Sequence, residues 1–214
     1  MSIPKIASYP MPRYDSYPLN KTCWRLNPEK SVLLVHDMQQ YFLDFYDTQA
    51  APIPTLVEHS RQLIQAARKL GIPIVYTAQS GDQTPEHRQL LTDFWGKGLS
   101  ADSEMTKIHD ALKPDSEDIV LEKWRYSAFK FSNLEERMTF WKRNQLVICG
   151  VYAHIGCLMS AAEAFMLNIQ PFMAADALAD FSLDEHEMAL KYTSTRCAQV
   201  MSTDQIIQQW VKHK

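Results

Sequence analysis

Three positions along the chain carry residue types that can take part in proton transfer. Asp37, Lys123 and Gly156 each close or follow a run of apolar residues. A carboxyl group can donate a proton to a ligand, and a nearby ammonium group shifts the pKa of that carboxyl and binds anions. A glycine lets a ligand approach the start of a helix, where free N–H groups also bind anions. The three positions therefore predict an acid–base site, although Asp37 taken alone would equally suit a helix cap or an ion pair.

These positions become neighbours only if the runs before them form strands of one sheet. Continuous apolar runs are typical of strands buried on both faces, and apolar residues at helical spacing indicate helices between them. The predicted strands are 31–38, 72–79, 119–123, 145–151, 171–176 and 199–202, and the predicted helices are 55–70, 133–143, 156–168, 184–198 and a last helix capped by Thr203. The carboxyl ends of such strands share one edge, where ligands bind.

Strands that alternate with helices predict an α/β fold with right-handed crossovers. We expect a single-domain, three-layer α/β/α arrangement with a mainly parallel six-stranded sheet. The excursion at 85–112 is expected to hold short helices. Residues 1–30 contain many prolines and tyrosines and show little periodicity, so we interpret them as an extended arm packed on the domain formed by 31–214.

Composition and charge argue against several classes of protein. The chain has 214 residues, is 46% hydrophobic and carries a formal net charge of -3, whereas a nucleic-acid binder normally shows a basic stripe. No apolar run reaches the roughly 18 residues that a membrane span needs, and the first residues lack the apolar core of a secretion signal. We therefore expect a cytoplasmic protein with reduced cysteines that binds neither nucleic acid nor a membrane.

The histidines do not predict a metal site. They stand at positions 36, 59, 87, 109, 154, 186 and 213, without the HxH or HxxxH spacing that places two imidazoles on one ion. His36 and His154 flank the predicted site, and we expect both to form hydrogen bonds within the core.

Six stretches of the sequence carry a resemblance to a known family. They are VLLVHDMQQYF (32–42), YTAQ (76–79), DFWGKGL (93–99), KWRYSAF (123–129), GVYAHIGC (150–157) and DALADFS (176–182). The chain resembles the isochorismatases, within the superfamily of isochorismatase-like hydrolases, over nearly its whole length, including the motif IPKI in the arm. The phenazine-pathway hydrolases of 2-amino-2-deoxyisochorismate show a similar pattern, and nothing in the residues separates the two substrates.

The resemblance implies a reaction and a set of site residues. It implies hydrolysis of the enol-pyruvyl ether of isochorismate, in catechol siderophore biosynthesis, to pyruvate and 2,3-dihydro-2,3-dihydroxybenzoate. Asp37 would be the proton donor, Lys123 would hold a carboxylate or the ether oxygen, and Gly156 would border the substrate, with no metal and no organic cofactor. The remaining implied contacts are hydrogen bonds from Gln79, Tyr126 and Tyr152, a carboxylate ligand in Arg88, and apolar walls from Phe42 and Trp95. A cis peptide between Val151 and Tyr152 is also implied.

A cysteine-dependent amidase is the second interpretation. Most members of the superfamily place a cysteine where this chain has Gly156, and Cys157 comes one residue later. One residue along a helix turns a side chain by about 100° and moves it about 1.5 Å. We therefore expect Cys157 to point into the core as an inert thiol, which leaves the amidase without its nucleophile.

A third interpretation is a docking module for siderophore assembly enzymes. Some isochorismatases carry a C-terminal aryl-carrier domain, and residue 214 stands where such a domain would begin. The presence of both Asp37 and Lys123 favours an enzyme over a purely structural partner. The family also suggests a homodimer or a larger homo-oligomer.

Overall fold

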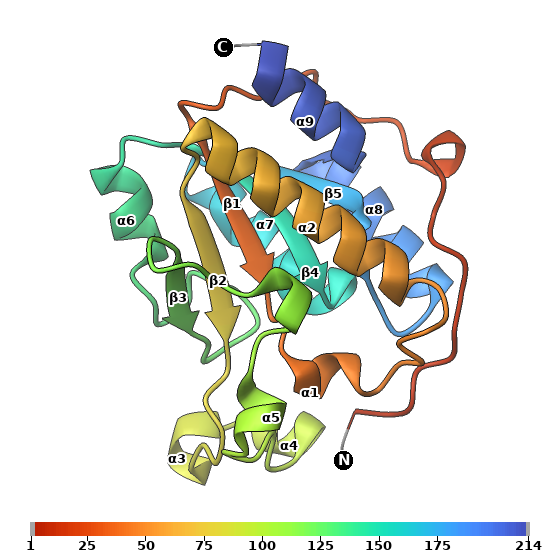
Figure 1. Ribbon diagram of the computed structural model, residues 1–214, viewed down its shortest axis with the longest axis vertical. Coiled ribbons are helices and arrows are strands. Elements are labelled where there is room, and N and C mark those ends of the chain that lie inside the picture. The colour runs from red at the N-terminus through yellow and green to blue at the C-terminus, as the bar shows by residue number, and fades with distance from the viewer. Residues whose placement is uncertain (1–2, 213–214) are drawn as a thin grey trace.

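Six strands form one sheet in the computed structural model, which describes residues 3–212 (Figure 1). The strands are β1 (Ser31–His36), β2 (Ile74–Ala78), β3 (Ile119–Glu122), β4 (Gln145–Val151), β5 (Gln170–Ala179) and β6 (Gln199–Met201). Their order across the sheet is β3-β2-β1-β4-β5-β6, and every pair is parallel. The predicted six-stranded sheet is confirmed, and it is fully parallel rather than mainly parallel.

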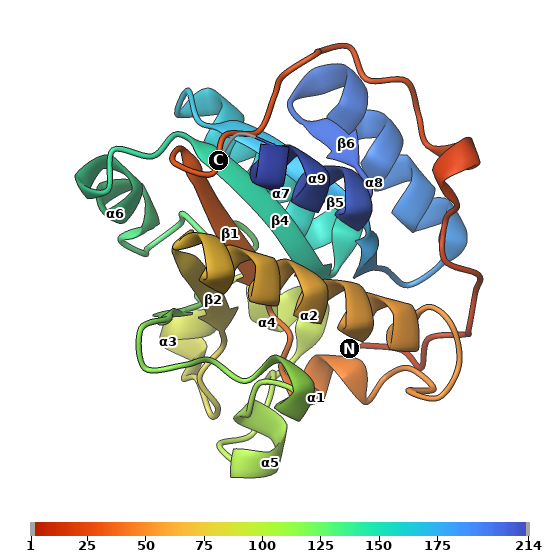
Figure 2. The same cartoon turned by 45° about the horizontal axis from the view of Figure 1, so that its top comes forward.

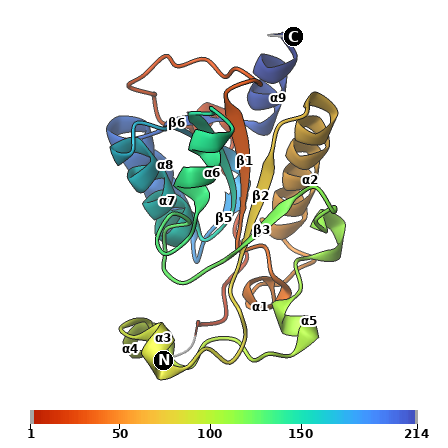
Figure 3. The same cartoon turned by 90° about the vertical axis from the view of Figure 1, so that its left-hand side faces the viewer.

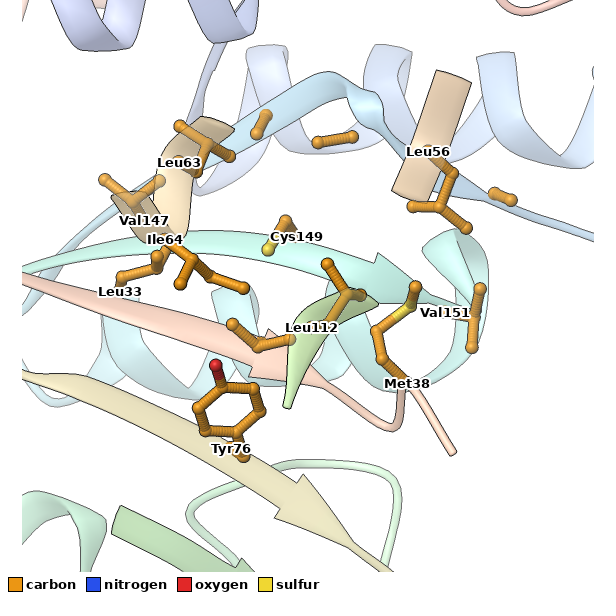
Figure 4. Close-up of a cluster of buried hydrophobic side chains, with 14 of the residues drawn as sticks. Leu33, Met38, Leu56, Leu63, Ile64, Tyr76, Leu112, Val147, Cys149 and Val151 are labelled. Carbon is orange, nitrogen blue, oxygen red and sulfur yellow. The ribbon is translucent and has the colours of Figure 1, made fainter. Parts of the chain in front are cut away.

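The continuous apolar run of β1 reflects burial on both faces of the sheet. Successive side chains of a strand point to opposite faces. Val32 and Leu34 accordingly join one hydrophobic cluster, whereas Leu33 and Val35 join the other. Figure 4 shows part of the second of these clusters, in which Leu33 lies among side chains of β4 and α2. A strand with two buried faces has no polar alternation, which is why a periodicity of two is missing from the sequence.

Helices cover both faces of the sheet and gather beyond one of its edges. They are α1 (Gln40–Leu43), α2 (Ile53–Leu70), α3 (Pro85–Arg88), α4 (Leu91–Trp95), α5 (Ser103–Thr106), α6 (Leu134–Phe140), α7 (Leu158–Met166), α8 (Leu183–Arg196) and α9 (Thr203–Lys212). Figure 3 shows α2 and α9 on one face and α6, α7 and α8 on the other. The short helices α1, α3, α4 and α5 lie beyond the carboxyl ends of the strands (Figure 1). None of the helices described is long and apolar enough to cross a bilayer.

The long helix α2 begins and ends on recognisable signals. Pro54 occupies the first turn, where the missing N–H costs no hydrogen bond. Gly71 ends the helix with a φ of 66°, a left-handed conformation that glycine adopts without strain. The predicted helix 55–70 is therefore confirmed, with two additional residues at its start.

Residues 3–30 contain one short 3-10 turn at Tyr14–Ser16 and no strand. They run along the outside of the molecule past α8 and α9 (Figure 2). The backbone N–H of Lys21 donates to the carbonyl of Ser194 in α8, and that of Leu26 donates to the Gln209 side chain in α9. Ile3, Ile6, Tyr9 and Leu26 are buried in the cluster that also contains α2 and α9.

Two predicted boundaries are wrong for the same reason, a misread polar residue. The strand predicted at 171–176 continues to Ala179, because Asp176 bonds to neighbouring elements rather than ending the strand. Its carboxylate accepts hydrogen bonds from the N–H and the hydroxyl of Thr203. Thr203 is therefore not the cap of α9. Ser202 is the cap, since its hydroxyl accepts from the N–H of Gln205, whose side chain accepts in turn from the N–H of Ser202.

The turn after β4 also differs from the prediction. The helix expected at 156–168 is preceded by a wide π-type turn, Ala153–Cys157, and α7 itself begins at Leu158. Gly156 consequently lies within the first, π-type turn of a helical segment that continues directly as α7. This difference changes what the backbone around Gly156 can bind.

Candidate active site

A cavity opens at the carboxyl edge of the sheet. It lies beyond β1, β2, β3 and β4, which is where a parallel sheet places its ligands. Every residue that the sequence predicted for the site lines it: Asp37, Phe42, Gln79, Arg88, Trp95, Lys123, Tyr126, Tyr152 and Gly156. The strand ends therefore bring together residues that are up to 119 positions apart in the sequence.

Asp37 and Lys123 form a buried ion pair in the wall of this cavity. The Lys123 Nζ donates to Asp37 Oδ2 at 3.1 Å, and the two side chains are 4% and 8% exposed. The Thr77 hydroxyl donates to Asp37 Oδ1 at 2.5 Å and accepts from the Asp37 N–H. Asp37 has a φ of 49°, a left-handed conformation that aspartate tolerates better than most residues. Hydrogen bonds thus hold both oxygens of the carboxyl group.

These contacts set the charge of the pair in the absence of a ligand. Burial raises the pKa of Asp37, but nearby positive charge and the hydrogen bonds from Thr77 and Lys123 lower it, and the net direction is downward. His36 adds little of that charge at neutral pH, because burial lowers the pKa of its ring to about 4. Lys123 is therefore the cation that keeps Asp37 ionised.

Gly156 lines the cavity, but its surroundings differ from the expectation. The space that its side chain would occupy is filled by the His36 ring, so a ligand cannot use it. Three of the N–H groups that were expected to be free for an anion are engaged in hydrogen bonds. The N–H of His154 donates to Asp180, and the N–H groups of Ile155 and Cys157 both donate to the carbonyl of Tyr152.

Arg88 reaches the cavity as a buried cation. It is 3% exposed, its Nε donates to the carbonyl of Gly96 at 2.9 Å, and its Nη1 lies 3.4 Å from Gln83 Oε1. No carboxylate within residues 3–212 pairs with it. Gly98 makes room for the guanidinium, since a Cβ there would overlap it. A buried arginine without a carboxylate indicates a place for a ligand's anionic group.

The aromatic residues differ in what they can offer a ligand. The Trp95 indole N–H donates to the Tyr126 hydroxyl oxygen at 2.8 Å, which leaves the Tyr126 O–H free to donate into the cavity. The Tyr152 hydroxyl donates to the carbonyl of Phe42 at 3.1 Å. Tyr152 therefore contributes its ring rather than its hydroxyl. The cis peptide that the resemblance implied lies between Val151 and Tyr152.

Gln79 owes its position to a neighbour that sequence reasoning did not single out. The buried side chain of Gln39 accepts from the Gln79 N–H at 2.7 Å and donates to the Gln79 carbonyl at 2.9 Å. The same amide donates to the carbonyl of Thr106 at 2.7 Å. Gln39 thus joins the ends of β1 and β2 to the excursion that covers the cavity.

Thr77, His36, Arg125 and Phe181 were also absent from the predicted site. His36, Arg125 and Phe181 line the cavity, and Thr77 supports Asp37 from behind. Arg125 could have been found from its motif, because it is the second cation in KWRYSAF. Thr77 also lies in a quoted motif, YTAQ, but a threonine in a strand does not by itself indicate a role in the site.

Cys157 lies outside the cavity. It is fully buried in the hydrophobic cluster formed with α7 and α8, as the register predicted. Burial raises the pKa of its thiol well above the ordinary value, so the thiolate that an amidase needs is disfavoured. No cysteine or serine appears among the residues that line the cavity in the described chain.

One group of potential metal ligands lies beside the cavity, in His154, Asp180 and Glu185. The oxygens of Asp180 already accept from the His154 N–H, the His154 ring and the Phe181 N–H, at 2.5 to 2.9 Å. The group therefore joins the turn after β4 to the end of β5 through hydrogen bonds.

A parallel sheet with an acid–ammonium pair at its carboxyl edge is the arrangement of an isochorismatase-like hydrolase. The family model described as Isochorismatase domain matches residues 31–205. The chain belongs to the isochorismatase family.

Relatives named for different biosynthetic products are similar to this chain. The protein named Isochorismatase of Bacillus subtilis (strain 168) is 50% identical over 98% of this chain and 67% of its own length. Enterobactin synthase component B of Escherichia coli (strain K12) is 46% identical over 97% of this chain and 73% of its own length. Phenazine biosynthesis protein PhzD1 of Pseudomonas aeruginosa is 46% identical over 96% of this chain and 99% of its own length.

Solved structures share the fold at low sequence identity. The crystal structure of a cysteine hydrolase from Pseudomonas syringae pv. phaseolicola aligns with a TM-score of 0.82 at 20% identity, over 93% of this chain and all of that one. This likeness shows the three-layer α/β/α fold.

Proposed function

We propose that the chain hydrolyses the enol-pyruvyl ether of isochorismate to pyruvate and 2,3-dihydro-2,3-dihydroxybenzoate. The observation that carries the proposal is the buried Asp37–Lys123 pair in a cavity that no cysteine or serine of residues 3–212 lines. An acid without a nucleophile suits a reaction whose difficult step is proton transfer to carbon. Hydrolysis of a vinyl ether is such a reaction.

The reaction proceeds through protonation and capture by water. Asp37 gives its proton to the terminal CH2 carbon of the enol-pyruvyl group, which becomes a methyl group and leaves an oxocarbenium ion. Water adds to that ion and loses a proton to the Asp37 carboxylate. The hemiketal hydroxyl then gives up its proton, the bond from the hemiketal carbon to the ether oxygen breaks, and that oxygen takes up a proton, which releases pyruvate and the diol. Water is the only other reactant, and Asp37 ends in the protonation state in which it began the cycle.

Substrate binding converts Asp37 from its ionised form to the protonated form that can donate a proton. The free pair holds an ionised carboxyl, because the pKa of Asp37 is lowered. Isochorismate brings two carboxylates, which neutralise the field of Lys123 and, by repulsion and exclusion of water, raise the pKa of Asp37. Asp37 therefore takes up a proton when the substrate binds, and it is this proton that Asp37 donates in the reaction.

The cations around the cavity match a substrate with two carboxylates. Among residues 3–212, Arg88 is buried without an acidic partner, and Arg125 at the cavity wall donates to the carbonyls of His87 and Trp124. Lys123 lies in the same wall, with its Nζ 3.1 Å from Asp37 Oδ2. Gln79, the Tyr126 hydroxyl and the rings of Phe42, Trp95 and Tyr152 complete the wall.

Hydrolysis of 2-amino-2-deoxyisochorismate is the second candidate function. It is favoured by the 46% identity to a protein named for phenazine biosynthesis, whereas the relative named Enterobactin synthase component B favours the siderophore pathway. The substrates differ at one ring substituent, hydroxyl against amine. We also propose that the chain acts as a homodimer and works beside siderophore assembly enzymes.

A coupled assay tests the proposal. Pyruvate release is followed as NADH oxidation by lactate dehydrogenase, with each of the two substrates offered in turn at matched concentrations. We expect turnover of isochorismate with the higher kcat/KM. A higher kcat/KM for the amino compound would move the assignment to the second candidate, and pyruvate from neither would overturn ether hydrolysis as the function.

A further inference from the structure

His36 is buried at the site but takes no direct part in proton transfer by Asp37. It is 1% exposed and closes β1 immediately before Asp37. Two glycines of the neighbouring chain segment accommodate it. At Gly150, whose φ is 116°, a Cβ would overlap the His36 carbonyl oxygen, and at Gly156 a Cβ would overlap the ring, 2.7 Å from Nε2 and closer to Cε1.

The contacts of the imidazole oppose its displacement by a side chain at position 156. Nδ1 lies 2.8 Å from the carbonyl oxygen of Val151, and Nε2 lies 3.3 Å from that of Tyr126. Both neighbours belong to segments that line the cavity. The neutral ring carries one N–H and can donate to only one of these carbonyls. It is nevertheless fully buried, and a Cβ at 156 would overlap its Cε1 and Nε2, so a residue larger than glycine there must shift the ring.

Position 156 is also where a nucleophile would reach the cavity. Gly156 lines the cavity together with Asp37 and Lys123, whereas Cys157, the next residue, lies in the hydrophobic cluster behind it. A thiol or hydroxyl carried at 156 would stand beside an ammonium group that favours its ionised form. The volume needed for that group is occupied by His36.

We propose that His36 is a positioning residue that determines which class of reaction the site performs. Its imidazole takes the place of a side chain at 156, which excludes a nucleophile from the turn, and its anchored ring fixes the end of β1 that presents Asp37. The part of this inference that concerns proton transfer rests on the proposed ether hydrolysis. The steric pairing of His36 with Gly156 does not depend on any substrate.

A double-mutant cycle on thermal unfolding tests the pairing without a substrate. His36→Asn keeps a donor near the position of Nδ1 and removes the Cε1 edge that faces residue 156. In the wild-type background we expect Gly156→Ala to lower Tm by roughly 4–10 °C, as overpacking of a buried site does in a chain of this length. In the His36→Asn background the same change is expected to lower Tm by less than half as much. Equal shifts in both backgrounds would overturn the pairing.

Kinetics separate positioning from a purely structural role. Gly156→Ala is expected to reduce kcat at least tenfold with little change in KM, because the displaced ring moves the carboxyl donor rather than the groups that bind the anion. His36→Asn combined with Gly156→Ala should recover part of that kcat relative to Gly156→Ala alone. A loss in KM alone, or no recovery in the double variant, would contradict the positioning role.

A thiol placed at 156 reports whether His36 keeps a nucleophile out. His36→Asn combined with Gly156→Cys is treated with iodoacetamide at pH 7, and the modified residues are located by peptide mass mapping. We expect alkylation at 156 at least tenfold faster than at the buried Cys157 in the same chain, with the exposed Cys23 as the positive control. Alkylation at 156 as slow as at Cys157 would overturn the inference. A failure of isochorismate turnover in the wild type would instead concern the proposed function, since neither unfolding nor alkylation needs that substrate.

Discussion

Replacement of Arg88 by methionine tests how the cavity recognises an anion. Arg88 is 3% exposed, and the protein partners of its guanidinium are a backbone carbonyl and an amide oxygen. Burial lowers the pKa of Arg88, because the charged guanidinium loses hydration. A bound carboxylate would offset that loss of hydration free energy. Methionine keeps much of the length and apolar contact of the side chain and removes the charge.

The structure allows the size of the effect to be worked out. A charge-assisted hydrogen bond contributes about 1.5–3 kcal/mol, which corresponds to a roughly 10- to 150-fold loss of affinity. The contact forms in the bound ground state as well as in the transition state, so KM for isochorismate should rise by that factor while kcat changes little. Lysine at 88 keeps the charge without the planar fork, and Arg88→Lys should give a smaller rise.

The assay is pyruvate release across a range of isochorismate concentrations, with Tm measured for each variant. Loss of the Nε bond to Gly96 alone should cost about 1 kcal/mol and lower Tm by roughly 2–4 °C. A folded Arg88→Met variant whose KM stays within twofold of the wild type would refute the assignment of Arg88 to the substrate carboxylate.

Two further predictions concern a thiol and acid stability. Cys157→Ala should keep kcat/KM for isochorismate within about threefold of wild type, because the thiol lies outside the cavity; in the same pyruvate assay, a loss of more than about a hundredfold would restore the thiol mechanism. Burial lowers the pKa of His36 and of His186 to about 4, against about 6.5 in the unfolded chain. The unfolded chain binds more protons between these values, so stability is complete above pH 6.5 and falls towards pH 4 by up to about 3 kcal/mol for each ring. Urea unfolding should show a shallower loss over this window in His186→Asn, and an unchanged pH dependence would contradict the buried, neutral state of that ring.

Much of the fold was predictable because its strands are buried on both faces. The run 145–151 was predicted with the boundaries that β4 has, since every residue in it is buried. The end of β5 was not predictable, because Asp176 looks like a terminating residue until its bonds to Thr203 and His59 are known. Hydrogen bonds to partners far along the chain leave no periodic signal.

The site was predictable where strand ends carried the unusual residues. Asp37 and Lys123 could be placed from two strand ends and a rule about parallel sheets, and the structure joins them in one ion pair. The relation between His36 and Gly156 could not be derived, because it depends on the wide turn at Ala153–Cys157, which brings the glycine against the ring. The position of Gly156 at the cavity was predicted well, but the unexpected turn type changed which groups surround it.

The most direct test of proton donation is the kcat of Asp37→Asn with isochorismate. Asparagine keeps the shape of the side chain and cannot donate the proton that carbon requires. A general acid contributes about 10²- to 10⁴-fold, so we predict a fall in kcat of at least a hundredfold, with KM within about threefold of the wild type and a cooperative thermal transition that shows a folded protein. A folded Asp37→Asn variant that releases pyruvate with a kcat within tenfold of the wild type would show that the proton comes from another group.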